Sequence, residues 1–98
     1  MITKKVNAKG NTTRVTFELP GDIAADSVAV VGNFNEWNPE ANPMKLLKKG
    51  TWKTALTLEN DAEYEFRYFL DGANWANDEA ADGTTPTEYF SENSVLAL

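Results

Sequence analysis

The sequence predicts an all-β fold: an antiparallel β-sandwich of immunoglobulin-like shape with about seven strands. Turn residues recur at short intervals from end to end, several segments alternate apolar and polar residues, and no stretch has a convincing helical period. The 98 residues include 42% apolar and 24% charged residues, which suffices for one hydrophobic core. We therefore expect the chain to fold as a single β-sandwich domain over 1–98.

The first half of the chain supplies three expected strands. Residues 2–6 could form the first, and Lys9-Gly10-Asn11 turns the chain into Thr13–Leu19, where apolar and polar residues alternate as in a half-buried strand. Pro20-Gly21 ends that segment. The apolar run within Ser27–Gly32 then predicts a strand that is buried on both faces.

The second half predicts a hairpin, one long strand and a closing strand. Gly50 lies between the expected strands 44–47 and 52–58, and the Trp52 side chain shares a face with Leu56 and Leu58, which places it in the core. The clearest strand is Ala62–Leu70, in which Tyr64, Phe66, Tyr68 and Leu70 face one way and Glu63, Glu65, Arg67 and Phe69 the other.

Asp71-Gly72 closes this long strand. We expect an irregular acidic loop over 76–88, a last strand at Ser94–Leu98, and at most a turn or two of helix at 22–26 or 38–42.

Charge and composition exclude several classes of function. Nine Lys and Arg against 15 Asp and Glu give a net charge of −6, so nucleic acid and membrane surfaces are poor partners. The absence of Cys and His removes thiolate chemistry, disulfides and imidazole ligands, and we expect no cofactor. The N-terminus has no apolar run of a signal peptide, so we expect a cytoplasmic protein.

The acidic residues could serve catalysis or metal binding. Glycoside hydrolysis needs a carboxylate pair in a deep cleft, which a small sandwich does not supply, so we expect no catalytic residues. Asp78, Glu79 and Asp82 carry oxygen ligands suited to calcium, but they lack the spacing and the glycine of an EF-hand loop. We expect a solvated acidic loop there and no metal site.

Trp37 and Trp75 fall in polar segments rather than in alternating strands. An indole can bury the C–H face of a pyranose, while amides, carboxylates or a guanidinium bind its hydroxyls. Burying ~100 Å² per ring is worth ~2.5 kcal/mol, which predicts a dissociation constant on the order of 0.1–1 mM for two rings. The alternative is that each indole tucks under its own loop.

Gly32-Asn33-Phe34-Asn35-Glu36-Trp37, Trp52, the segment 64–72 that ends in Asp71-Gly72, Trp75 and Glu92-Asn93-Ser94-Val95 occur in that order. As an ordered set they resemble the family 48 carbohydrate-binding modules. These include the glycogen-binding domain of the AMP-activated protein kinase β subunit and the N-terminal domains of isoamylases and branching enzymes. The resemblance covers the chain from about Val15 to its end.

The resemblance implies a non-catalytic module that binds α-1,4-linked glucan such as glycogen or starch. By position, it implies that Trp37 and Trp75 stack on sugar, that Arg67 replaces a hydrogen-bonding lysine, and that Asn93 binds hydroxyls. Tyr89 and Ser91 match positions at the rim of the family's groove. The chain departs from the kinase-type domain where Ala73-Asn74 lengthens a turn by one residue and where Tyr89-Phe90 replaces Leu-Gly.

The resemblance also leaves an alternative open. Sandwiches of this family often pack on a catalytic barrel or a kinase subunit, so the chain could be an interaction or accessory domain that docks in trans on a glycoside hydrolase, branching enzyme or kinase. A glucan binder must keep Trp37 and Trp75 exposed, whereas a docking domain would cover an exposed apolar patch with its partner.

Overall fold

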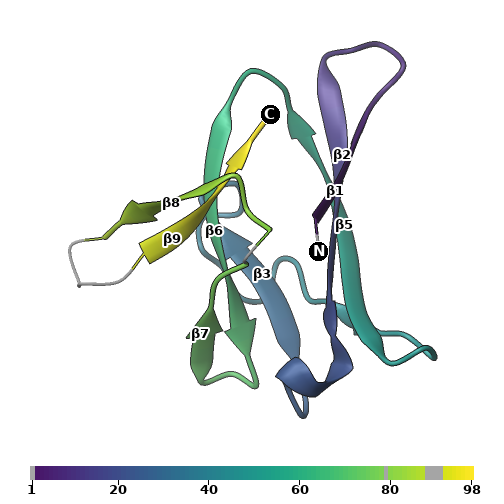
Figure 1. Ribbon diagram of the computed structural model, residues 1–98, viewed down its shortest axis with the longest axis vertical. Coiled ribbons are helices and arrows are strands. Elements are labelled where there is room, and N and C mark those ends of the chain that lie inside the picture. The colour runs from purple at the N-terminus through teal and green to yellow at the C-terminus, as the bar shows by residue number, and fades with distance from the viewer. Residues whose placement is uncertain (1, 79, 88–91) are drawn as a thin grey trace.

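A computed structural model describes residues 2–78, 80–87 and 92–98, and in this part of the chain two antiparallel sheets pack face to face as a sandwich (Figure 1). The all-β, immunoglobulin-like prediction is confirmed. The described strands are β1 Ile2–Val6, β2 Thr12–Pro20, β3 Val28–Gly32, β4 Lys45–Leu46, β5 Thr51–Glu59, β6 Glu63–Leu70, β7 Asn74–Ala76, β8 Gly83–Pro86 and β9 Glu92–Ala97.

The strands are distributed between two sheets, and the chain passes from one sheet to the other more than once. The first sheet has the order β1-β2-β5-β4, and the second has the order β3-β6-β9-β8. The short strand β7 pairs with β6 beyond the end of β9, so that β6 carries β9 along Glu63–Phe66 and β7 along Tyr68–Leu70. Strands β7 and β9 are therefore both attached to β6.

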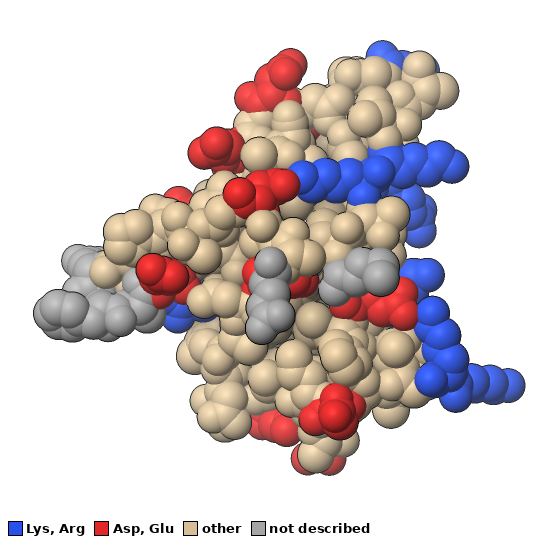
Figure 2. All heavy atoms as spheres, in the orientation of Figure 1, with Lys and Arg blue, Asp and Glu red and all other residues tan. Residues whose placement is uncertain are grey.

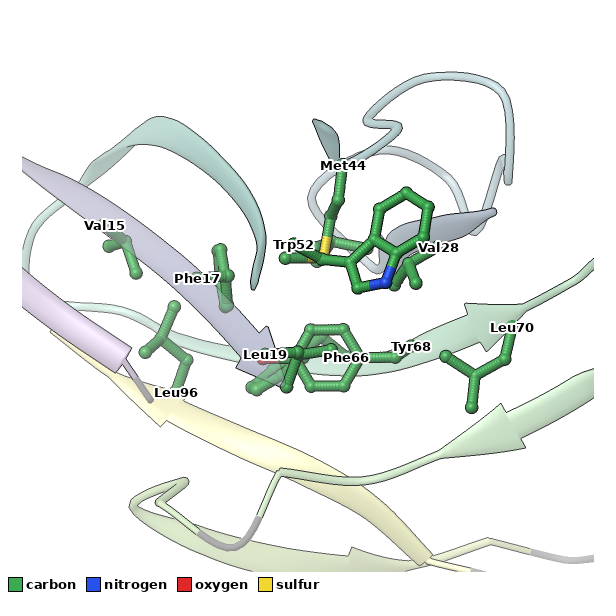
Figure 3. Close-up of a cluster of buried hydrophobic side chains, with 11 residues drawn as sticks. Val15, Phe17, Leu19, Val28, Met44, Trp52, Phe66, Tyr68, Leu70 and Leu96 are labelled. Atoms are coloured by element: carbon green, nitrogen blue, oxygen red, sulfur yellow. The ribbon is translucent and has the colours of Figure 1, made fainter. Parts of the chain in front are cut away.

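The core lies between the inner faces of the sheets. Phe17 of β2 meets Phe66 and Tyr68 of β6 edge to face, with ring centroids 5.3 and 6.2 Å away. Trp52 is buried as predicted, and its indole N–H donates to the Gly21 carbonyl at 3.3 Å. Figure 3 shows the buried side chains, which come from both sheets: Val15, Phe17, Leu19, Val28, Met44, Trp52, Phe66, Tyr68, Leu70 and Leu96.

The structure corrects the expected loop over 76–88 and the expected helix. Thr84 and Thr85 lie in strand β8, which pairs with β9, and Trp75 lies in strand β7 rather than in a loop. Both strands are too short, with three and four residues, to show the apolar alternation that marks longer strands. A single 3₁₀ turn covers Gly21–Ile23, and the segment 38–42 forms turns instead of a helix.

The prediction of a solvated acidic loop is wrong for Asp78. Asp78 is buried, with 8% of its surface exposed, instead of being solvated. Asp82 accepts a hydrogen bond from the Ala97 amide at 2.8 Å and pairs with Lys4 at 2.6 Å, which links the two sheets along one edge. Both carboxylates serve the structure because each has donors from other strands within reach.

The turn between β6 and β7 is anchored to the segment before β3 by the side chain of Asp71. Asp71 and Gly72 both have positive φ, 53° and 67°, as the tight turn requires. The Asp71 carboxylate accepts the backbone N–H groups of Ala25, Asp26 and Ser27 at 3.0, 2.6 and 3.0 Å. These bonds lower the pKa of Asp71 below its ordinary value and anchor the turn that precedes Trp75.

Among the described residues, no helix is long and apolar enough to cross a membrane.

Candidate functional site

The outer face of the second sheet brings together several of the predicted site residues. Phe66, Tyr68 and Leu70 of β6 point into the core, so the alternating residues Arg67 and Phe69 point outward. Directly opposed residues of antiparallel strands point to the same side of their sheet. The pairing pattern therefore identifies the outward neighbours of Arg67 and Phe69.

An apolar row crosses this outer face. Phe69 is paired with Trp75 on one side and with Ala29 on the other, and Ala29 is bridged to Pro43. The Phe69 and Trp75 rings lie against each other, with centroids 4.5 Å apart and planes tilted by 39°. Trp75 nevertheless keeps 49% of its surface exposed, because only part of the indole is covered by Phe69.

Polar groups lie beside this row. Asn93 precedes Ser94, which pairs with Phe66, and it therefore faces outward next to Arg67. The Asn93 side-chain amide donates to the Glu65 carboxylate at 3.1 Å. This bond fixes the amide plane of Asn93 and adds a carboxylate to the site, which would accept hydrogen bonds from paired hydroxyls.

Trp37 lies in the loop that leaves β3 next to β6. Asn33 begins this loop and pairs with the Glu65 backbone in both directions, donating its N–H to the Glu65 carbonyl and accepting the Glu65 N–H on its side-chain oxygen. The Trp37 N–H then donates to the Gly32 carbonyl at 2.9 Å. With 38% of its surface exposed, Trp37 is accessible.

The loop around Trp37 is rigidly braced and locally strained. Asn35 accepts the Gly32 N–H at 3.0 Å and donates to the Val30 carbonyl at 3.0 Å and to Asn42 at 2.7 Å. Glu36 and Trp37 both adopt left-handed φ, 59° and 58°, which costs about 1 kcal/mol or more per residue. Strain of this kind concentrates where a side chain must be presented in one orientation.

Two of the predicted site residues, Tyr89 and Ser91, lie outside the described residues. In the described part of the chain, no group of three or more acidic, Cys or His side chains could hold a metal ion.

Sequence reasoning missed Phe69 and Glu65 as members of the site. The alternation in β6 places both on the outward side of the strand. An aromatic ring on an outer face next to a tryptophan near the strand's end is therefore a usable signal for the site. Asn77 and Asp78 follow β7 and bond to β9, and no pattern in the sequence indicates this role.

A β-sandwich with accessible aromatic rings and hydrogen-bonding side chains has the features of a binding module. Comparison with known proteins agrees. Residues 8–83 match the family model of carbohydrate-binding module 48, the isoamylase N-terminal domain. The chain belongs to this family of non-catalytic modules.

Two relatives are much longer enzymes. The chain is 30% identical over 83 residues, 84% of its length, to 1,4-alpha-glucan branching enzyme GlgB of Aquifex aeolicus (strain VF5). It is 36% identical over 59 residues, 56% of its length, to the amylopullulanase of Thermoanaerobacter thermohydrosulfuricus. The matched regions are 12% and 4% of those proteins, so the similarity concerns one part of each enzyme.

Proposed function

We propose that residues 1–98 are a single module that binds α-1,4-linked glucan, such as glycogen or starch, without catalysing a reaction. The observation that carries the proposal is the exposed Trp75 indole seated on Phe69, on the same face as Arg67 and Asn93. The apolar face of a glucose ring stacks on Trp75, and a second ring stacks on Trp37. Arg67 and Asn93 bind the sugar hydroxyls, and Tyr89 and Ser91 stay further candidates for sugar contacts because they match positions of the family's groove.

Two findings support the choice of an α-glucan. The chain belongs to a carbohydrate-binding family, and it is similar to parts of a 1,4-alpha-glucan branching enzyme and an amylopullulanase. Since the matched regions are small parts of a branching enzyme and an amylopullulanase, we propose that a glycan-active enzyme is the functional partner of this module.

The experiment is a titration of tryptophan fluorescence with maltoheptaose. Cellohexaose, which has the same sugar with β linkages, is the control ligand, and Trp37→Ala and Trp75→Ala are the site variants. We expect a saturable change with the α-linked sugar only, with a dissociation constant on the order of 0.1–1 mM, and loss of binding in both variants. Leu46→Ala, which truncates an exposed apolar side chain on the other sheet, should bind like the native protein. No change at millimolar maltoheptaose would contradict the proposal.

A second candidate function is docking on an enzyme in trans, and the distribution of cations favours it. Eight of the nine Lys and Arg residues lie in the strands and hairpins of the first sheet, whereas Arg67 lies in the second. One of the eight, Lys4, reaches the second sheet at its edge through Asp82. Figure 2 shows blue side chains gathered along the β1, β2 and β5 side of the molecule. They are Lys4, Lys5, Lys9, Arg14, Lys45, Lys48, Lys49 and Lys53.

Two pairs of these cations are directly opposed across strands. Lys5 is paired with Arg14, and Lys45 with Lys53, and like charges in such positions destabilise a sheet. A face that keeps these pairs in a chain of net charge −6 is suited to an acidic protein surface. Docking there would leave the outer face of the second sheet open for glucan, so both functions are compatible.

A further inference from the structure

Strands β7 and β9 carry Trp75 and Asn93, and each of them pairs with β6 rather than with the other. The relative position of the two side chains is therefore set through β6 and through any direct link between β7 and β9. Asn77 and Asp78, the two residues that follow β7, supply that link.

Asn77 connects the end of β7 to β9 through both ends of its amide. The Asn77 Nδ2 donates to the Glu92 carbonyl at 2.9 Å, and its Oδ1 accepts a hydrogen bond from the Ser94 hydroxyl at 2.9 Å. These two partners flank Asn93 in the sequence. Asn77 thus holds β9 on both sides of the residue that faces the site.

Asp78 ties the same point to the core. Its N–H donates to the Ser94 Oγ at 3.1 Å, and its carboxylate accepts the Tyr68 hydroxyl at 2.5 Å and the Ala80 N–H at 2.8 Å. Tyr68 and Ser94 are fully buried, so no water competes for these bonds. Burial and the adjacent Asp78 raise the pKa of Tyr68, which keeps its hydroxyl a donor.

We propose that Asn77 and Asp78 are positioning residues of the glucan site: they set the position of Trp75 on β7 relative to Asn93 on β9. The inference rests on the proposed function for its ligand, but the geometry that it describes can be measured without one. Neither residue contacts sugar. Their effect on affinity passes through the placement of the two strands, because a binding group displaced by a fraction of an ångström loses much of its hydrogen bonding.

The test compares Asn77→Ala with Asn60→Ala. Asn60 is a matched control because its side chain also bridges two segments, donating to the Gly10 carbonyl and accepting from Thr13, but these lie in and beside the first sheet. Two quantities are measured for each variant: the dissociation constant for maltoheptaose, and the NMR signals of the Trp75 indole N–H and the Asn93 side-chain amide.

We expect Asn77→Ala to weaken maltoheptaose binding by about three- to tenfold and to shift the Trp75 and Asn93 signals, with the Trp37 and Trp52 indole signals unchanged. Asn60→Ala should leave the affinity and all of these signals as in the native protein. Tyr68→Phe, which removes the core donor to Asp78 and keeps the ring, should shift the same two signals as Asn77→Ala.

Native-like Trp75 and Asn93 signals in Asn77→Ala would overturn the inference, as would equal loss of affinity in Asn60→Ala. If the native protein does not bind maltoheptaose, the proposed glucan function fails. The NMR signals of Asn77→Ala still decide in that case whether Asn77 positions the two strands.

Discussion

The phenyl ring of Phe69 lies against the indole of Trp75, with centroids 4.5 Å apart and planes tilted by 39°. Phe69 therefore covers part of the indole and leaves 49% of the Trp75 surface exposed.

Phe69→Ala tests the role of this contact. Aromatic pairs contribute about 0.5–1.5 kcal/mol beyond burial, so removing the phenyl ring should weaken maltoheptaose binding by about two- to tenfold and should move Trp75 fluorescence to longer wavelength. The affinity of Phe69→Leu for maltoheptaose should lie between those of the native protein and Phe69→Ala. A native affinity in Phe69→Ala would show that the indole holds its position unaided.

Asp71 predicts a specific dependence of stability on pH. Its three backbone hydrogen bonds lower the pKa of the carboxyl below its ordinary value of 3.8. The stabilisation is therefore fully present above the unfolded-state pKa and is lost as the pH falls through the lower, folded-state pKa. Asp71→Asn should unfold at lower urea concentration than the native protein at pH 7, and the difference should shrink towards pH 3. A difference that is constant from pH 7 to pH 3 would mean that the charge of Asp71 contributes nothing.

Gly21 predicts a steric effect that its sequence context does not reveal. A Cβ added at this residue would lie 2.0 Å from the Gly50 carbonyl oxygen, which is a backbone atom and cannot rotate away. Gly21→Ala should cost about 1–3 kcal/mol of the free energy of unfolding, measured by urea denaturation. Gly83→Ala is the matched control, since nothing lies within 4 Å of its added Cβ, and it should change stability little. Equal stability of the two variants would contradict the close packing at Gly21.

Lys45→Glu tests the opposed cations of the first sheet. Lys45 lies directly opposite Lys53, so the substitution replaces a repulsive cross-strand pair with an attractive one. We expect a gain of about 0.3–1 kcal/mol in the free energy of unfolding, which decreases as salt is added. If the cationic face docks on an acidic partner, the same variant should weaken that complex while it stabilises the free module. A loss of stability at low salt would argue against the repulsion.

Sequence reasoning located the long strands well. Alternation in β2 and β6 identified which side chains enter the core, and Phe17, Phe66 and Tyr68 are all fully buried. It failed for β7 and β8, whose three and four residues are too few for an alternating pattern and become strands by pairing with β6 and β9. It also failed for Asp78, since an acidic residue in a polar segment is normally solvated and is buried here because the Tyr68 hydroxyl lies within reach.

The class of fold and the outward or inward side of each residue in the long strands follow from the sequence, because successive side chains of a strand point to opposite faces whatever its neighbours are. The tertiary structure alone decided which outward residues became neighbours. Phe69 and Trp75 are close in sequence but meet only through the β6–β7 register, and Glu65 meets Asn93 only because β6 and β9 pair. Such contacts depend on long-range pairing, for which no local pattern of residues carries the information.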